Sequence, residues 1–396
     1  MSAHPVQHLV SAALIVRDEA AVLAECLESI RPVVDEIVVL DTGSVDDSPM
    51  IAERAGARVS HRPWADDFAA ARNAALELCR GQWILYIDAD ERLTPTTRTA
   101  MEALLVGAPE VAFRLLLRPF TGATLYREYR LWRNDPRIRF EGAIHEKVVP
   151  SIHAVAEADG RPISPCDLLL DHVGYEGDQT RKHRRNLPLL RRQLETEPDN
   201  LFNWHHLARV LSGLGEQEES ERVLVHAIEV ARAKPLPDPA GVLAYAELVA
   251  TRLARGDDAG ELLAEARERY PTNWVLRWLE ARILVAAGTY DEALDHLDDL
   301  AGVDVSGLAD QGPAYDERLF GEFAQDTRGL CLMRLGRYHE AAAAYGEALR
   351  LSPGNRAYVA KQELALARAA RTGRVAAPGK GEGRTGSHAP APTYSG

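Results

Sequence analysis

The chain has 396 residues, of which 46% are apolar and 27% are charged, so most of it is expected to fold into ordinary globular domains. Its net charge of −13 argues against nucleic acid binding, and no apolar run approaches the roughly 20 residues that a membrane-spanning helix needs. The four cysteines are far apart, and the first ten residues lack the basic and apolar segments of a signal peptide. These features predict a cytoplasmic protein without a membrane span.

The first half of the chain alternates between strand-like and helix-like segments. Buried strands are expected at Leu9–Val16, Glu36–Leu40, Ala57–Ser60 and Trp83–Ile87. Helices are expected between them, over about Ala20–Ile30, Ser48–Gly56 and Asp66–Cys79. This order predicts a parallel sheet with helices on both faces. Strand-like segments without long helices between them follow at Val111–Leu117 and Thr124–Leu131, and they predict a mixed, partly antiparallel addition to the sheet.

The second half is predicted to be helical and internally repetitive. Glycines that end a first helix, such as Gly288 and Gly336, are each preceded at the same spacing by a small residue, Ala281 and Gly329. Small residues at fixed places let paired helices approach closely, and this pattern resembles the tetratricopeptide repeat of about 34 residues. Four helical pairs over about 201–353 would stack as a solenoid, followed by a capping helix over about 356–371.

These patterns divide the chain into an α/β part and an all-α part. An N-terminal domain is expected over residues 1–180, a linker helix over 181–200, and helical repeats with a capping helix over 201–371. Residues 372–396 are rich in Gly, Ala, Pro and Ser and are expected to be disordered. The basic run Arg181–Arg192 is interpreted as the solvated face of the linker helix, with phosphate contact as the alternative.

Two acidic residues follow the fourth predicted strand. Residues two apart in an extended backbone point the same way, so Asp88 and Asp90 would present two carboxylates at the carboxyl end of this strand. Ligands of open α/β sheets bind at that end. Adjacent carboxylates repel each other unless a cation lies between them, and carboxylate with phosphate oxygen is the usual coordination of Mg²⁺ or Mn²⁺. The pair predicts a metal ion that holds a diphosphate; two solvated acids in a turn are the alternative.

Further candidate ligands lie where the first two strands end. Arg17 and Glu19 follow the first strand, and Arg17 would contact the nucleotide or the diphosphate. Asp41 would accept a hydrogen bond from a nucleobase or ribose, and Gly43 would let the backbone approach the ligand. The alternative for Asp41 is a turn residue that bonds to the loop amides. Arg72 would pair with a phosphate or, alternatively, form a structural salt bridge.

These segments together resemble the family 2 glycosyltransferases with the GT-A fold. The matching pieces are Ile15–Glu19, Val38–Asp46, Asp67–Asn73 and Ile87–Glu91. Three more pieces, Arg130–Asn134, Phe140–Glu146 and His172–Tyr175, resemble a subgroup that carries C-terminal tetratricopeptide repeats and includes the glycosyltransferases that modify the peptide sublancin. The resemblance covers about residues 9–355, and the ordered series of motifs is more specific than any one piece.

The resemblance implies an N-terminal GT-A, Rossmann-like domain that transfers a sugar from a nucleotide donor with inversion at the anomeric carbon. Its implied cofactors are Mn²⁺ or Mg²⁺ and a nucleotide sugar, with a UDP-sugar as the default. The implied metal ligands are Asp88, Asp90 and His145. The implied donor contacts are Val16, Arg17, Glu19, Asp41, Gly43, Arg72, Asp88 and Ala89. The implied candidates for the base that deprotonates the acceptor are Glu141, His145 and Glu146.

Several alternatives stay open at this point. Many family members carry a second acid where this chain has Thr42, so GDP or dTDP donors compete with UDP donors. His145 is alternatively a packed histidine bonded to backbone. His172 has the same two interpretations as His145, a functional residue or a packed histidine, with weaker support for the first. The repeats would bind a peptide or protein acceptor, or mediate a homodimer.

Two other function classes compete with a glycosyltransferase. One is a degenerate transferase domain that serves as an adaptor through its repeats, against which the intact Asp88 and Asp90 argue. The other is a nucleotidyltransferase, which normally has a glycine-rich loop after the first strand. Arg17-Asp18-Glu19 is not such a loop.

Overall fold

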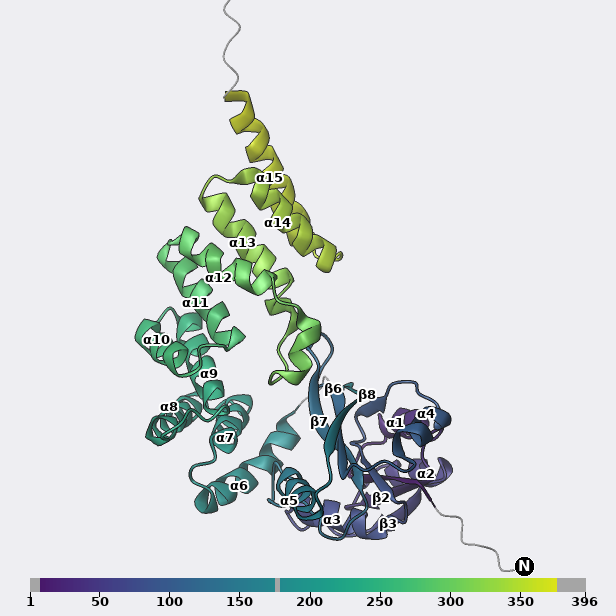
Figure 1. Ribbon diagram of the computed structural model, residues 1–396. Helices are drawn as coiled ribbons and strands as arrows, with labels where there is room; N and C mark the ends of the chain where they lie inside the picture. Colours follow the sequence, from purple (N-terminus) through teal and green to yellow (C-terminus); the bar gives the residue numbers. More distant parts are fainter. Residues whose placement is uncertain (1–7, 175–178, 376–396) are drawn as a thin grey trace, which may run out of the picture.

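The computed structural model describes residues 8–174 and 179–375, which form an α/β domain and a long array of helices (Figure 1). Within the first range, one eight-stranded sheet has the strand order β3-β2-β1-β4-β7-β6-β8-β5. Its strands in chain order are β1 Val10–Val16, β2 Glu36–Asp41, β3 Arg58–His61, β4 Trp83–Tyr86, β5 Glu91–Leu93, β6 Ala112–Arg118, β7 Tyr126–Arg133 and β8 Ile163–His172. Strands β1 to β4 run parallel, and β7 is antiparallel to both β4 and β6. The mixed α/β sheet expected from the sequence is confirmed.

Helices cover both faces of this sheet. Alternate residues of β1 point to opposite faces, so Leu14 packs into the core beneath one set of helices and Ala13 into the core beneath the other. The first set contains α1 Leu23–Ile30, α2 Ser48–Arg54 and α4 Arg98–Leu105. The second contains α3 Phe68–Leu78 and α5 Val149–Asp159. Asp67 caps α3 by accepting a hydrogen bond from the Ala70 amide at 2.8 Å, which fixes where this helix begins.

Four elements have no counterpart in the sequence expectations: β5, α4, α5 and β8. Strand β5 has only three residues, too few for a periodic pattern. Strand β8 contains Pro165 and alternates weakly between buried and exposed positions. These two strands pair with each other in antiparallel register, with Glu91 opposite His172. They complete the sheet at the end of the strand order opposite β3, and their pairing places His172 beside the loop that carries Asp88 and Asp90.

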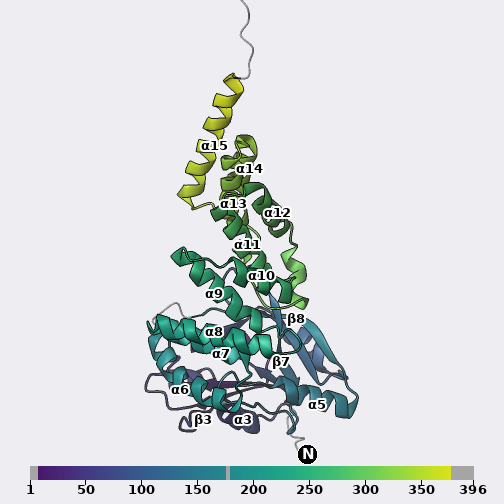
Figure 2. The same ribbon diagram turned by 90° about the vertical axis from the view of Figure 1, so that its left-hand side faces the viewer.

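The second part of the chain is a stack of antiparallel helices that rises away from the sheet (Figures 1 and 2). It begins with α6 Thr180–Thr196, which follows the α/β domain. The helical pairs are α7 Leu201–Gly213 with α8 Gln217–Ala233, α9 Gly241–Arg255 with α10 Gly260–Arg269, α11 Trp274–Ala287 with α12 Tyr290–Ala301, and α13 Glu322–Arg334 with α14 Tyr338–Leu351. The solenoid that was expected from the repeats is therefore confirmed.

The last described helix, α15 Arg356–Val375, packs along α14. It is longer than the capping helix expected over 356–371, so residues 372–375 of the expected tail form its final turn. The remainder of that tail, residues 376–396, lies outside the described residues. None of the helices in the described ranges is both long and apolar enough to cross a membrane.

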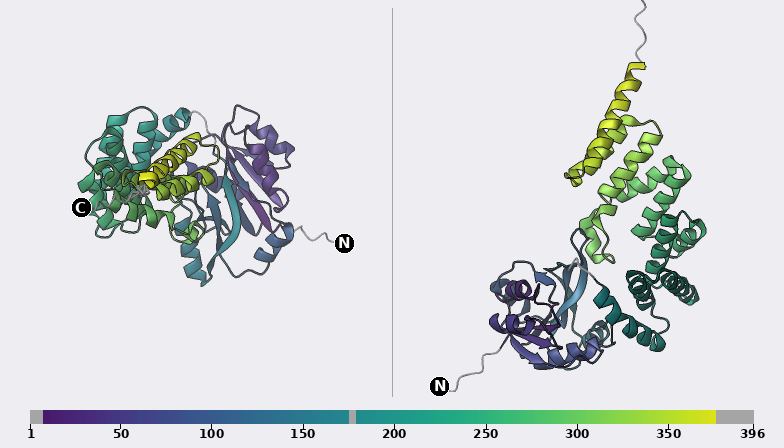
Figure 3. Two further views of the ribbon diagram at one scale, coloured as in Figure 1. Left: turned by 90° about the horizontal axis from the view of Figure 1, so that it is seen from above. Right: turned by 180° about the vertical axis from the view of Figure 1, so that it is seen from behind.

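The helical array is fastened to the α/β domain at two places (Figure 3). The first is α6, whose Leu190 packs with Ile144 of the α/β domain and Leu207 of α7. The second is the segment between α12 and α13, which contains the short 3-10 helices η1 Val305–Asp310 and η2 Glu317–Leu319. Here the Thr124 amide donates to the Tyr315 carbonyl at 2.8 Å, and the Tyr315 amide donates to the Thr124 hydroxyl at 2.8 Å. Two attachments far apart in the sequence hold the first repeats in a defined place beside the sheet.

Candidate functional site

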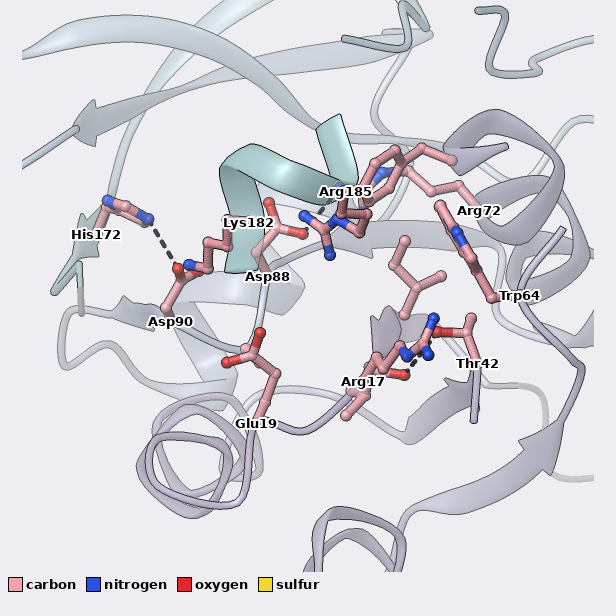
Figure 4. A pocket seen from close by; sticks show the side chains of 14 residues that line it. Arg17, Glu19, Thr42, Trp64, Arg72, Asp88, Asp90, His172, Lys182 and Arg185 are labelled. Carbon is pink, nitrogen blue, oxygen red and sulfur yellow. Dashed lines mark hydrogen bonds and ion pairs between the residues drawn. The ribbon is translucent and has the colours of Figure 1, made fainter. Parts of the chain in front are cut away.

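A pocket of about 250 Å³ lies at the carboxyl ends of β1, β2 and β4 (Figure 4). The structure brings together seven of the residues expected to bind donor or metal: Val16, Arg17, Glu19, Arg72, Asp88, Ala89 and Asp90. They lie at the ends of β1 and β4 and in α3, which are far apart in the chain, and the two strand ends meet at one edge because β1 and β4 run parallel.

Asp88 is held between two buried arginines. Arg72 donates from Nη2 to Asp88 Oδ1 at 3.0 Å, and Arg130 Nη1 lies 3.5 Å from Oδ2. The Tyr86 ring lies between the two guanidinium groups, each centred 4.3 Å from its centroid, and the Tyr86 hydroxyl donates to Asp88 Oδ2 at 3.1 Å. Burial alone would raise the pKa of Asp88, but the two arginines lower it to about 2. Asp88 is therefore ionised and fixed in orientation.

The loop after β4 is closed by Glu91, which is 2% exposed. Its carboxylate accepts from the Asp88 amide at 2.9 Å and from Arg130 Nη2 at 2.7 Å. Burial raises the pKa of Glu91 to about 7 in spite of the neighbouring guanidinium. Arg130 thus binds two carboxylates of the same loop, which sets where Asp88 and Asp90 point.

Asp90 faces His172 from the end of β8. The pairing of β5 with β8 brings these residues together, and His172 Nε2 lies 3.1 Å from Asp90 Oδ2. The other ring nitrogen, Nδ1, lies 2.7 Å from the Pro119 carbonyl, so Nδ1 carries a proton that it donates to this oxygen. The hydrogen bond that Nε2–H donates to the Asp90 carboxylate raises the pKa of His172 to about 9.

The chemistry of Asp90 and His172 fits a divalent cation. Nδ1 is bonded to a carbonyl, so a cation that displaces the Nε2 proton would meet the Nε2 lone pair, which is the usual arrangement for a metal-ligating histidine. Among the described residues, no three His, Cys, Asp or Glu side chains form a complete metal cage. Magnesium at nucleotide sites is commonly bound by one or two carboxylates together with the substrate's phosphates, so a complete protein cage is not required.

In the loop after β2, Asp41 and Gly43 do not line the pocket, although they were expected to contact the donor. Asp41 is 4% exposed, and its carboxylate accepts from the Gly43 and Ser44 amides, each at 3.1 Å, and lies 3.2 Å from His61 Nδ1. This is the turn-forming role that was the alternative for Asp41. Gly43 adopts φ 107°, which the turn needs and which favours glycine. Neither residue lines the pocket; Thr42 does.

The three candidates for the catalytic base lie in one loop but in different surroundings. Glu141 is exposed. His145 adopts φ 51°, and its ring centroid lies 4.1 Å from that of His206 and 5.1 Å from that of Phe202 in α7. Burial, together with Lys147, lowers the pKa of His145 to about 4. The loop therefore places the His145 ring against α7, where the repeats begin, and not beside Asp90. Among the described histidines, His172 is the one that lies beside Asp90.

Glu146 is the candidate base that is connected to the pocket. Its carboxylate forms an ion pair with Arg72 Nε, and only 10% of its side chain is exposed. Arg72 therefore bridges Glu146 and Asp88, one carboxylate from the base loop and one from the loop after β4.

Sequence reasoning did not select three residues that line the pocket, Trp64, Lys182 and Arg185; for the basic run Arg181–Arg192, phosphate contact was only the alternative. Lys182 and Arg185 belong to α6, which was interpreted as a solvated linker. Their spacing of three places them on the same face of the helix as Leu189, which is 2% exposed, and this spacing was the available signal. Trp64 precedes α3 in a segment without a periodic pattern.

Comparison with known families agrees with this architecture. Residues 11–144 match glycosyl transferase family 2, and residues 252–306 and 323–355 each match a tetratricopeptide repeat family. The chain thus consists of a family 2 glycosyltransferase domain followed by tetratricopeptide repeats, as the sequence motifs indicated.

The chain is also similar to individual proteins. A TPR repeat-containing protein of Synechococcus elongatus is 38% identical over 57% of this chain and 58% of its own length. The SPbeta prophage-derived glycosyltransferase SunS of Bacillus subtilis is 26% identical over 53% of this chain and 51% of its own length. The chain spans between half and three fifths of these curated relatives. Among solved structures, glucosyl-3-phosphoglycerate synthase of Mycobacterium tuberculosis with Mn²⁺ and UDP-glucose has 19% identity and a TM-score of 0.34, covering 46% of this chain and 77% of that one.

We predict that Arg72→Ala destabilises the α/β domain by about 3–5 kcal/mol, because it leaves Asp88 and Glu146 without their shared cation. Arg72→Lys should recover only part of this loss, since an ammonium group cannot replace a planar guanidinium that binds two carboxylates. Urea denaturation followed by tryptophan fluorescence measures the change. The control Arg62→Ala removes an exposed arginine and should have an effect below about 0.5 kcal/mol. A loss below about 1 kcal/mol for Arg72→Ala would contradict the bridging role.

Proposed function

We propose that this protein is a glycosyltransferase that moves a sugar from a nucleotide-sugar donor to an acceptor, with the donor's diphosphate bound at the edge that carries Asp88 and Asp90. The observation that carries the proposal is the Asp90–His172 pair, which faces the pocket at the carboxyl ends of the parallel strands. The match to family 2 glycosyltransferases supports the same reaction class. A UDP-sugar is the default donor.

Different residues of the pocket would bind the metal ion and the nucleotide of the donor. Asp90 and His172 would hold a divalent cation such as Mn²⁺ or Mg²⁺, and Asp88 stays a predicted third ligand although its carboxylate is already bonded to Arg72. When bound, such a cation supplies Lewis-acid stabilisation of the negative charge on the leaving diphosphate. Arg17 and Thr42 line the side of the pocket where the nucleotide is expected.

We further propose single-step inversion with Glu146 as the base. Inversion by direct displacement needs a group that removes the acceptor's proton. Glu146 is fixed by Arg72 and lies beside the joint with the repeats, whereas Glu141 is exposed and His145 is packed against His206 and Phe202. The base would thus lie between the donor pocket and the repeats.

The acceptor is proposed to be a peptide or protein segment that binds beside the first repeats. A hollow of about 770 Å³ lies there between α9, α11 and the η1 segment, lined by Phe202, Leu243, Trp274, Pro313 and Tyr315 among others. Phe202 touches the His145 ring, next to Glu146 in the chain, so this hollow adjoins the base loop. Its apolar and aromatic lining suits an apolar side chain of an acceptor.

A competing function is an adaptor that binds partners through its repeats without turning over a donor. The ionised and oriented Asp88 argues against it, because a degenerate site has no need for two buried arginines around one carboxylate. A homodimer formed through the repeats stays a prediction, and size-exclusion chromatography with light scattering would test it.

We predict that Asp90→Asn lowers donor hydrolysis and transfer by about 10²-fold or more, because it removes charge from the site that stabilises the leaving group. Release of nucleoside diphosphate from UDP-, GDP- and dTDP-sugars with Mn²⁺ measures this. The matched control is Asp171→Asn, which changes an aspartate that precedes His172 and pairs with Arg118 outside the pocket. Absence of binding and hydrolysis of every nucleotide sugar by the unaltered protein would refute the enzyme and favour the adaptor.

We predict that Glu146→Gln abolishes sugar transfer but leaves binding of the donor within about threefold, because a base acts on the acceptor and not on the donor. Glu141→Gln, in the same loop but exposed, should transfer at a rate close to that of the unaltered protein. Calorimetric titration of the donor and a transfer assay separate the two effects. If Glu141→Gln is the variant that loses transfer, the assignment of the base is wrong.

We predict that a peptide acceptor protects the backbone amides of residues 240–243 and 269–274 from hydrogen exchange, because the first turns of α9 and α11 and the loops before them line the 770 Å³ hollow. Exchange is measured by mass spectrometry with and without the acceptor, in the presence of a nucleoside diphosphate. The helix α14, which lies outside the hollow, is the internal control. Protection confined to α13–α15 would place the acceptor elsewhere and contradict the proposal.

A further inference from the structure

The linker helix α6 lies over the carboxyl edge of the sheet. Arg181 pairs with Asp18 in the loop after β1, and Arg192 Nη2 donates to the Asp66 carbonyl before α3 at 2.9 Å. Arg185 lies over the Phe68 ring in the first turn of α3, 5.1 Å from its centroid. Three side chains along one helix therefore contact two segments beside the donor pocket, the loop after β1 and the start of α3, and α6 forms part of the pocket's wall.

Two cations of α6 point into this pocket without an ion-pair partner. Figure 4 shows Lys182 and Arg185 on the same side of α6, above Asp88 and Asp90. Arg17 lines the pocket from the other side. Within the described ranges, no carboxylate lies within 4.0 Å of the charged groups of these three residues, whereas the neighbouring Arg181 is paired.

The charge balance of the pocket favours an anion. Asp88 is paired with Arg72, and Asp90 lies against His172 at the proposed metal site. The other charged residues that line the pocket are three cations, Arg17, Lys182 and Arg185, and one carboxylate, that of Glu19. Burial and the neighbouring Arg17 both lower the pKa of Arg185 from its usual value. Like charges that converge on one hollow cost free energy unless an ion of opposite charge binds between them.

A second hollow, of about 400 Å³, adjoins the pocket and shares its charged residues. Arg17, Glu19, Lys182 and Arg185 line both hollows, so the cations stand where the two meet. A ligand that extends from the Asp90 side of the first hollow into the second would pass between them. A diphosphate carries two linked anionic groups, which suits a position lined by several cations.

We propose that Lys182 and Arg185 bind the diphosphate of the donor, which makes the helix that joins the two domains part of the donor site. This inference rests on the proposed function and extends it. In the reaction, the bond between the anomeric carbon and the diphosphate oxygen breaks, and the electron pair leaves with the nucleoside diphosphate. The acceptor oxygen, nitrogen or sulfur bonds to that carbon, and its proton passes to Glu146. Lys182 and Arg185 neutralise the charge that grows on the leaving group.

The proposal is tested by calorimetric titration of the full chain with whichever of UDP, GDP and dTDP binds most tightly, in Mn²⁺ and in EDTA. Lys182→Met and Arg185→Met, which keep an unbranched apolar stem but remove the charge, should each weaken diphosphate binding about tenfold, equivalent to about 1.4 kcal/mol. Binding of the matching monophosphate should change less than threefold. Lys182→Arg should retain most of the affinity because it keeps the charge, which excludes misfolding as the cause of the loss.

The matched control is Arg184→Met, which removes an exposed arginine from the same helix. It should bind the diphosphate as the unaltered chain does. If Lys182→Met and Arg185→Met also bind normally, while the unaltered chain binds the diphosphate and transfers sugar, the role of α6 is refuted and the proposed function stands. Inorganic pyrophosphate that binds as tightly as the nucleotide would mean a site for free phosphates and overturn the inference. Absence of any nucleotide binding by the unaltered chain would refute the proposed function itself.

Discussion

The candidate site depends on the two buried arginines that enclose Tyr86 and hold Asp88. Arg72 and Arg130 are each 8% exposed, and between them they bind Asp88, Glu91 and Glu146. Buried charges are costly unless each has a partner, so this cluster is stable only as a complete set. Its members come from α3, β5, β7 and two loops, so the set fixes the position of Asp88 relative to Glu146, the proposed base.

The helical part of the chain also contributes to the candidate site, through α6 and through the segment between α12 and α13. The α6 helix supplies Lys182 and Arg185 to the donor pocket and packs Leu190 against α7 on the way to the repeats. The η1 segment returns to the α/β domain through Tyr315 and Thr124. A donor bound between the sheet and α6 would therefore stabilise the joint next to which the acceptor is proposed to bind, which links occupancy of one substrate site to the geometry of the other.

The strands that are buried on both faces could be predicted from the sequence, because continuous apolar runs are specific for them. Asp88 and Asp90 could be recognised as candidate ligands because they directly follow such a run. The sequence was insufficient for His172, whose position depends on the pairing of the three-residue strand β5 with β8. The family resemblance implied His145 as a metal ligand, but the backbone of His145 is left-handed and its ring packs against His206 of α7. For Lys182 and Arg185 the sequence left phosphate contact as an alternative, because the packing of α6 against the α/β domain decides where its basic face points.

The most direct test of the account is a crystal structure of the full chain with a nucleotide sugar and Mn²⁺. The account predicts density for the ion at Asp90 and His172, and for the diphosphate between the ion and the side chains of Lys182 and Arg185. A nucleotide bound elsewhere on the chain, or a diphosphate that contacts neither Asp90 nor α6, would contradict it.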